Sequence, residues 1–206
     1  MNNSETISLT ALERYYHLHA RIYDSTRWSF LFGRRALVRA LARHCQPQRI
    51  LEVGCGTGYN LQLLQQQFPD AELTGIDLSA DMLAVAKHKL GNRVRLLTQR
   101  YDQPLAATAG FDVIVFSYAL SMFNPGWETA LKSAAKDLQP GGHLACVDFH
   151  TTTSRLFARW MAFNHVQMGG HISRALQADF HTDDLRLHNA YGKLWQYLLF
   201  IGQPRH

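Results

Sequence analysis

The chain has 206 residues, of which 47% are hydrophobic and 18% are charged, and its formal net charge at pH 7 is +5. This size and composition fit one globular domain spanning residues 1–206 and exclude a largely disordered protein. No apolar run reaches the roughly 18 residues of a membrane span, and the polar start of the chain lacks the basic and apolar regions of a signal peptide, so we expect a cytoplasmic protein.

The excess positive charge lies in residues 1–50, where eight arginines face Glu5, Glu13 and Asp24, which gives 8 − 3 = +5. The remainder of the chain is therefore neutral. No nucleic-acid-binding module accompanies these arginines, so we expect no nucleic-acid partner. A peripheral contact with the inner face of an anionic membrane is one hypothesis for the basic segment, and an ordinary solvated surface is the other.

The N-terminal residues combine a helical pattern with a dense aromatic group. Residues 5–23 carry apolar side chains at helical spacing and predict a lid-like helix. The group that follows comprises Trp28, Phe30, Leu31 and Phe32. Such a group fits core packing, and it also fits a contact with a substrate or a membrane.

The segment from Arg34 to His44 predicts an amphipathic helix. Arg35, Arg39 and Arg43 repeat every four residues and form a basic stripe, with apolar side chains on the other side.

The most informative stretch is Arg49-Ile-Leu-Glu-Val-Gly-Cys-Gly-Thr-Gly-Tyr-Asn60, which predicts a strand, a tight turn and a helix. Glycine at positions 54, 56 and 58 allows positive φ and the close approach of a ligand, and the N-terminus of a helix offers N–H groups to it. Asp77 closes the next apolar stretch, where a carboxylate can hold the two hydroxyls of a ribose. The loop therefore predicts a nucleotide-like ligand. The spacing departs from the dinucleotide fingerprint Gly-x-Gly-x-x-Gly, which weakens an NAD interpretation.

Beyond this loop the pattern alternates between helix and strand. Helices are predicted at 59–68, 79–90 and 127–138, and strands at 72–76, 93–98, 111–117 and 143–149. This alternation predicts an α/β fold, a Rossmann-like doubly wound and mostly parallel sheet. Residues 185–201 predict a C-terminal hairpin turning at Gly192-Lys193. Residues 151–180 remain as a substrate-side insertion.

Glu52 before the loop and the later Leu138-Gln-Pro-Gly-Gly142 make residues 34–150 resemble the class I S-adenosylmethionine (SAM) methyltransferases. The resemblance implies SAM as the cofactor, an antiparallel terminal hairpin, and a core at 34–150 between a lid or substrate region at 1–33 and a substrate-side part at 151–206. The cofactor-binding residues that it implies are Glu52, Gly54, Cys55, Gly56, Thr57, Gly58, Asp77, Leu78, Met82, Gln99, Arg100, Tyr101 and Ser117. Many relatives have an acid at the start of the third loop, whereas this chain offers Gln99 or a displaced Asp102 for the adenine.

Methyl transfer relies on positioning more than on strong acids or bases, but an amine acceptor must lose a proton. The catalytic candidates are Tyr23, Tyr118, Asp148 and His150, each of which also has an ordinary structural interpretation. No metal site is predicted, because the 11 histidines and the cysteines Cys45, Cys55 and Cys146 show no metal-ligand spacing.

The segments 21–34 and 117–122 resemble bacterial enzymes that methylate lipid head-group amines, especially those that complete betaine lipids from diacylglyceryl-homoserine. This resemblance favours a methyltransferase acting on a lipid amine. The alternatives are a soluble small-molecule methyltransferase, an NAD-dependent oxidoreductase, and a SAM-binding protein without turnover. The oligomeric state and the number of methyl groups added stay open.

Overall fold

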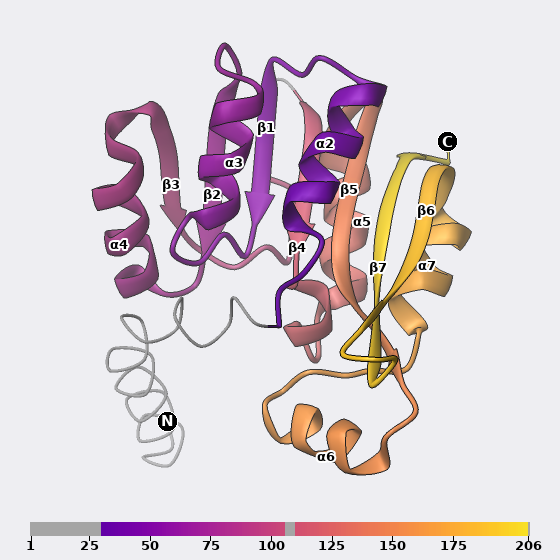
Figure 1. Cartoon of the computed structure of the whole chain (residues 1–206). Helices are drawn as coiled ribbons and strands as arrows, with labels where there is room; N and C mark the ends of the chain where they lie inside the picture. Colours follow the sequence, from indigo (N-terminus) through magenta and orange to yellow (C-terminus); the bar gives the residue numbers. More distant parts are fainter. Residues whose placement is uncertain (1–29, 106–109, 206) are drawn as a thin grey trace, which may run out of the picture.

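A single seven-stranded sheet with the order β3-β2-β1-β4-β5-β7-β6 organises the protein (Figure 1). The structure is a computed structural model that describes residues 30–105 and 110–205. The predicted helix at 5–23, together with Tyr23 and Trp28, lies outside the described residues. The predicted fold class is confirmed: the sheet is mostly parallel and ends in an antiparallel hairpin.

The described helices and strands follow the predicted alternation closely. The α-helices are α2 (Arg34–His44), α3 (Tyr59–Gln67), α4 (Ala80–Leu90), α5 (Trp127–Asp137), α6 (Arg155–Phe163) and α7 (His171–Asp179). The strands are β1 (Arg49–Val53), β2 (Glu72–Asp77), β3 (Val94–Thr98), β4 (Phe111–Ser117), β5 (Leu138–Thr152), β6 (Phe180–Ala190) and β7 (Trp195–Pro204). Two short 3-10 turns are η1 (Gly91–Arg93) and η2 (Leu120–Met122).

The parallel strands end at one common edge of the sheet. Val53, the last residue of β1, pairs with Ile76 of β2 and with Phe116 of β4. This carboxyl edge lies at the bottom of Figure 1, where α6 stands below the ends of β5 and β7. Loops that leave these strands therefore meet at one edge, as expected for a ligand site in an open parallel sheet.

Alternation along the strands separates two apolar cores, one on each face of the sheet. Helices α2, α3 and α4 cover the first face, with Leu41 and Leu64 fully buried there. Helices α5 and α7 cover the second face, with Leu131 and Leu176 in its core. A strand buried on both sides has to be apolar almost throughout, and β4 is so from Val113 to Phe116.

The largest differences from the predicted boundaries occur in β5 and in the hairpin. Strand β5 begins at Leu138 instead of 143. Its pairing with β4 shifts in register between Phe111 and Val113 of β4. Gly141, at φ +79°, lies in this first part of β5. The hairpin is longer than predicted and covers 180–204.

Residues 151–180, predicted as a substrate-side insertion, form two helices, α6 and α7, with different surroundings. Its second half, α7, packs its buried residues Ile172 and Leu176 against the sheet and belongs to the core. Only α6 stands apart at the carboxyl edge (Figure 1).

Candidate functional site

The glycine loop between β1 and α3 lies at the carboxyl edge and has room for a ligand. Gly54, Gly56 and Gly58 all have positive φ, at 72°, 53° and 77°. A Cβ on Gly56 would meet no protein atom within 4 Å, whereas one on Gly58 would lie 2.8 Å from Leu90 and 3.0 Å from Ala86. Gly58 therefore allows α3 and α4 to pack closely, and Gly56 leaves open space in front of the loop.

Asp77, at the end of β2, connects the two halves of this loop region. Its carboxylate accepts from the backbone N–H of Gly56 at 2.8 Å and from that of Ser79 at 2.9 Å. Burial raises the pKa of Asp77, and these N–H donors oppose the rise. A carboxylate has about four acceptor positions, so beside the N–H groups of Gly56, Ser79 and Leu78 it can still accept from a ligand hydroxyl group.

Glu52 and Asn60 form a buried polar pair behind the loop. Glu52 is 1% exposed, and burial raises its pKa to about 8 although the nearby charge of Arg34 acts in the opposite direction. Within the described part of the chain, Glu52 Oε2 makes no hydrogen bond of good geometry, and the neighbouring Asn60 side chain opposes the rise in the Glu52 pKa as a hydrogen-bond donor. Buried polar atoms without partners are rare in folded proteins and often mark a ligand site.

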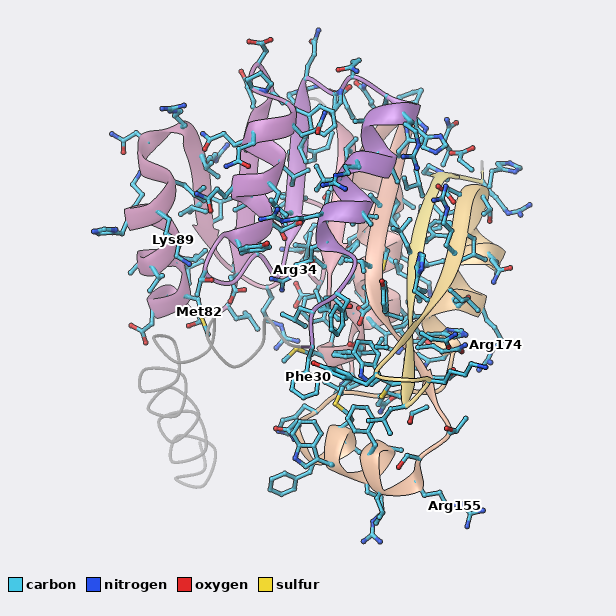
Figure 2. All side chains as sticks on the ribbon, in the orientation of Figure 1. Phe30, Arg34, Met82, Lys89, Arg155 and Arg174 are labelled. Atoms are coloured by element: carbon cyan, nitrogen blue, oxygen red, sulfur yellow. The ribbon has the colours of Figure 1, made fainter. Side chains whose placement is uncertain are left out.

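Arg34, the first residue of α2, is a site residue that the sequence analysis did not assign. Its guanidinium carbon lies 5.4 Å from the ring centre of Tyr59 and 5.9 Å from that of Tyr118. Figure 2 shows Arg34 where α2 begins, beside the lower end of β1. The sequence held only one signal for it, an arginine at the start of the helix that precedes the strand and glycine loop.

These groups suit SAM in charge and shape. The open space at Gly56 admits a ligand backbone, the carboxylate of Asp77 suits a ribose diol, and Glu52 suits an ammonium group. A cation at Arg34 suits the carboxylate of an amino acid moiety. The residues present therefore fit this cofactor.

The predicted adenine-side residues take different positions. Arg100 pairs with Asp102 at 3.1 Å on the surface, and the neighbouring Gln99 is also exposed. Tyr101 points into the second core, where its hydroxyl donates to Asp137 at 2.8 Å. Asp137 also accepts from the N–H of Leu105, so its carboxylate holds two points of the loop after β3. Which residue meets the adenine stays a prediction.

The remaining predicted cofactor residues lie around the loop. Leu78 is 63% exposed, and Met82 is buried at the start of α4, near the lower edge in Figure 2. The other three are buried: Cys55, Thr57 and Ser117.

Tyr118 and Asp148 are engaged by internal partners. The Tyr118 hydroxyl donates to the carbonyl of Phe32 at 2.7 Å, and burial raises the pKa of Tyr118 well above its usual range. Asp148 is fully buried and accepts from the N–H groups of Ser121 and Phe149. Burial raises its pKa to about 6, and the bond from Ser121 holds the turn η2 against β5.

His150 differs from both, because its Nδ1 is buried and has no hydrogen-bond partner among the described residues. Burial lowers the pKa of His150, with a further decrease from Arg174. Along β5, Phe149 faces the first core, and Asp148 and His150 alternate to the other face. Tyr118 packs on Phe149 with ring centres 4.7 Å apart, and the charge of Asp148 is near enough to add to the rise in the Tyr118 pKa.

An aromatic cluster fills the edge between α6 and the hairpin. The ring centre of Phe30 lies 5.9 Å from that of Trp160 and 6.1 Å from that of Tyr191. Phe32 continues the cluster toward Trp195 and Tyr197, at 6.0 and 6.4 Å. In Figure 2, Phe30 lies between the lower edge of the sheet and α6. Residues far apart in the sequence thus meet here.

Helix α2, which carries the basic stripe, runs along the first face of the sheet, away from this edge (Figure 1). Arg43 lies 3.8 Å from Asp184, which also pairs with Arg186 at 2.8 Å. Among residues 30–105 and 110–205, no helix is both long and apolar enough to cross a bilayer. The same residues contain no group of three or more His, Cys, Asp or Glu side chains that could hold a metal ion.

Comparison with known proteins agrees with this geometry. Residues 50–142 match the family model described as "Methyltransferase domain". Malonyl-[acyl-carrier protein] O-methyltransferase of Priestia megaterium is 33% identical over 150 residues, which cover 71% of this chain and 54% of that protein. The chain thus spans about half the length of this curated relative.

Two solved structures share the fold. The N-methyltransferase NodS of Bradyrhizobium japonicum, in complex with S-adenosylhomocysteine, matches with a TM-score of 0.68 and 20% identity over 84% of this chain and 86% of its own. The 1,6-didemethyltoxoflavin N1-methyltransferase of Burkholderia thailandensis, with its substrate and S-adenosylhomocysteine bound, gives a TM-score of 0.72 and 17% identity over 100% and 92% of the two chains.

Proposed function

We propose that this chain, which carries a class I SAM-dependent methyltransferase domain, transfers methyl groups from SAM to an amine of a lipid head group at a membrane surface. The observation that carries methyl transfer is the arrangement at the ends of β1 and β2, where Asp77 holds the open glycine loop at Gly56. SAM supplies a methyl group on a positively charged sulfur. The residues of the chain bind and orient it.

In this proposal the donor side works through fixed polar groups. Asp77 accepts from the ribose hydroxyls, Glu52 from the ammonium, and Arg34 pairs with the carboxylate. Because Glu52 is buried and Asp77 is held by backbone N–H groups, these residues would hold the donor in one orientation.

On the acceptor side, the aromatic cluster supports an amine. Aromatic faces attract an ammonium group and stabilise the cation that forms when nitrogen gains a methyl group. Phe30, Phe32 and Tyr191 provide such faces at the same edge as the glycine loop. The attacking nitrogen must first lose a proton so that its lone pair can reach the methyl carbon.

His150 is the proposed proton acceptor among the predicted catalytic residues. Its pKa is lowered by burial, so the ring is neutral at pH 7, and its Nδ1 has no partner in the described part of the chain. Tyr118 and Asp148 instead position Phe32 and η2. Tyr23 stays a candidate outside the described residues.

A second function follows from the O-methyltransferase named among the relatives, which acts on a malonyl group. An acidic small molecule could use Arg174 and His171, which flank Gly169-Gly170 near the end of β5. In that case the acceptor is a carboxylate and no proton acceptor is needed.

The test is an assay of the purified protein with methyl-labelled SAM and, in separate reactions, lipid vesicles containing an amino head group and small organic acids. Mass spectrometry would show lipid products heavier by one or more methyl groups. Labelled esters of the acids with no labelled lipid would contradict the lipid proposal and favour the second function. Asp77→Ala serves as the inactive control.

A further inference from the structure

Helix α6 presents a continuous apolar surface to solvent. Leu156 is 80% exposed, Trp160 50% and Phe163 84%. These residues follow one another at spacings of four and three, so they share one side of the helix. The opposite side is anchored, because Met161 is buried and Phe157 packs against the first core. The exposure is thus a property of a fixed helix.

The surroundings of this surface are positively charged. Arg155 and Arg159 stand on α6 itself, and Lys193 lies in the hairpin turn. The sequence contains no Asp or Glu between Phe149 and Ala178, and none after Asp184. A helix with Trp, Phe and Leu beside arginine is the pattern of a segment that lies in a membrane interface.

Aromatic contacts hold Trp160 of this apolar surface in place. Trp160 packs against Phe157 at 5.8 Å and Phe30 at 5.9 Å between ring centres. Tyr191, 54% exposed in the hairpin turn, contacts Phe30 as well. Figure 2 shows Arg155 pointing away from the protein at its lower end, where α6 is the outermost element. The apolar and basic groups therefore protrude together and form a convex surface.

We infer that α6, with the adjoining hairpin turn, docks the protein on an anionic phospholipid surface. Leu156, Trp160 and Phe163 enter the interface, and Arg155 and Arg159 meet the lipid phosphates. A protruding row of apolar side chains suits insertion between lipids better than contact with the charged surface of an acidic protein. The lack of acidic residues over 149–178 gives charge complementarity with an anionic bilayer.

The inference rests on the proposed function, to which it adds the face that meets the lipid. It also differs from a membrane contact through the α2 stripe, which lies along the side of the sheet. With α6 on the membrane, the aromatic cluster at Phe30 and Tyr191 sits directly behind the docking surface. A lipid head group would then reach the carboxyl edge without leaving the bilayer.

Vesicle sedimentation tests this surface separately from methyl transfer. Vesicles of equal parts phosphatidylglycerol and phosphatidylcholine should bind the wild-type chain, and pure phosphatidylcholine should bind it weakly. Arg155→Glu/Arg159→Glu should lower the partition coefficient at least ~tenfold, because two attractive charges become repulsive. The matched control Arg93→Glu/Arg95→Glu makes the same charge change at exposed positions at the end of η1 and in β3, and it should stay within about twofold of wild type.

The apolar contribution is measured with Leu156→Ser/Phe163→Ser against Leu187→Ser, which removes an exposed leucine from β6. In addition, brominated phospholipids should quench the tryptophan fluorescence of the wild type, and Trp160→Phe should lose most of that quenching. SAM binding by each variant verifies its fold. Equal vesicle binding by all variants, or binding to an acyl carrier protein in place of vesicles, would overturn the inference; vesicle binding without methylated lipid would refute only the proposed function.

Discussion

The two ends of the carboxyl edge are built in opposite ways. At β1 and β2, a polar site consists of backbone N–H groups and two carboxyl groups, all within a short stretch of chain around the glycine loop. At β4, β5 and β7, an aromatic cluster gathers side chains from 30–32, α6 and the hairpin. The difference teaches that the structure of the polar end, the proposed donor side, is determined by local sequence. The structure of the aromatic end, the proposed acceptor side, is determined only by the complete fold.

The largest expected effect concerns the donor side. Gly56→Val places a side chain in front of the loop at φ +53°, where its Cβ meets no protein atom within 4 Å, so it should block the ligand. We expect SAM affinity to fall at least about 100-fold, measured by calorimetry. Gly141→Val is the matched control, because Gly141 also has positive φ and no atom within 4 Å of its Cβ position. Equal losses of affinity in both variants would show that backbone strain, not the site, is responsible.

The second prediction concerns pH. The folded pKa of Glu52, about 8, exceeds its ordinary value of 4.5, so the folded state holds the proton more tightly. Its contribution to stability is therefore complete below about pH 4.5 and is lost as the pH rises through about 8. A cationic ligand favours the ionised form, whose fraction rises from about 1% at pH 6 to about half at pH 8, so SAM affinity should rise at least about tenfold over this range.

Glu52→Gln should flatten both pH profiles, since the amide does not titrate. Calorimetry at several pH values and chemical denaturation provide the two measurements. A variant that keeps the wild-type slope would assign the titration to another group and would separate Glu52 from the donor site.

The smallest effect tests the acceptor side. Tyr118→Phe removes the hydroxyl that donates to the Phe32 carbonyl at 2.7 Å, so the protein should lose about 1 kcal/mol of unfolding free energy. Because Phe32 belongs to the aromatic cluster, KM for the acceptor should rise while SAM affinity is unchanged. A fall in SAM affinity would mean that the two ends of the edge are coupled more closely than their separate construction suggests.

The local structure of the polar end could be predicted because its signals are short-range. The glycine spacing, Asp77 and the alternation of helix and strand lie within a few tens of residues, and the roles of these residues in binding SAM stay predictions. The predicted fold is confirmed, and residues 50–142, which include the glycine loop, match the methyltransferase family model.

The aromatic end could not be predicted in the same way. Phe32 meets Trp195 and Tyr197 only after β7 inserts beside β5, so no local pattern reveals the contact. The role of α7 was missed for a related reason: its nine residues carry a helical pattern, but the face that they cover is set by sheet order. The roles of His150 and of the lipid acceptor stay predictions.

The central claim is that the ends of β1 and β2 hold SAM through Asp77. Its most direct test is calorimetric titration of the wild type, Asp77→Ala and Asp70→Ala with SAM. Asp70 is an exposed acid in the turn before β2 and provides the control. The structure predicts that wild type and Asp70→Ala bind alike and that Asp77→Ala, shown to be folded by circular dichroism, gives no measurable binding heat. Wild-type affinity in folded Asp77→Ala would contradict the claim.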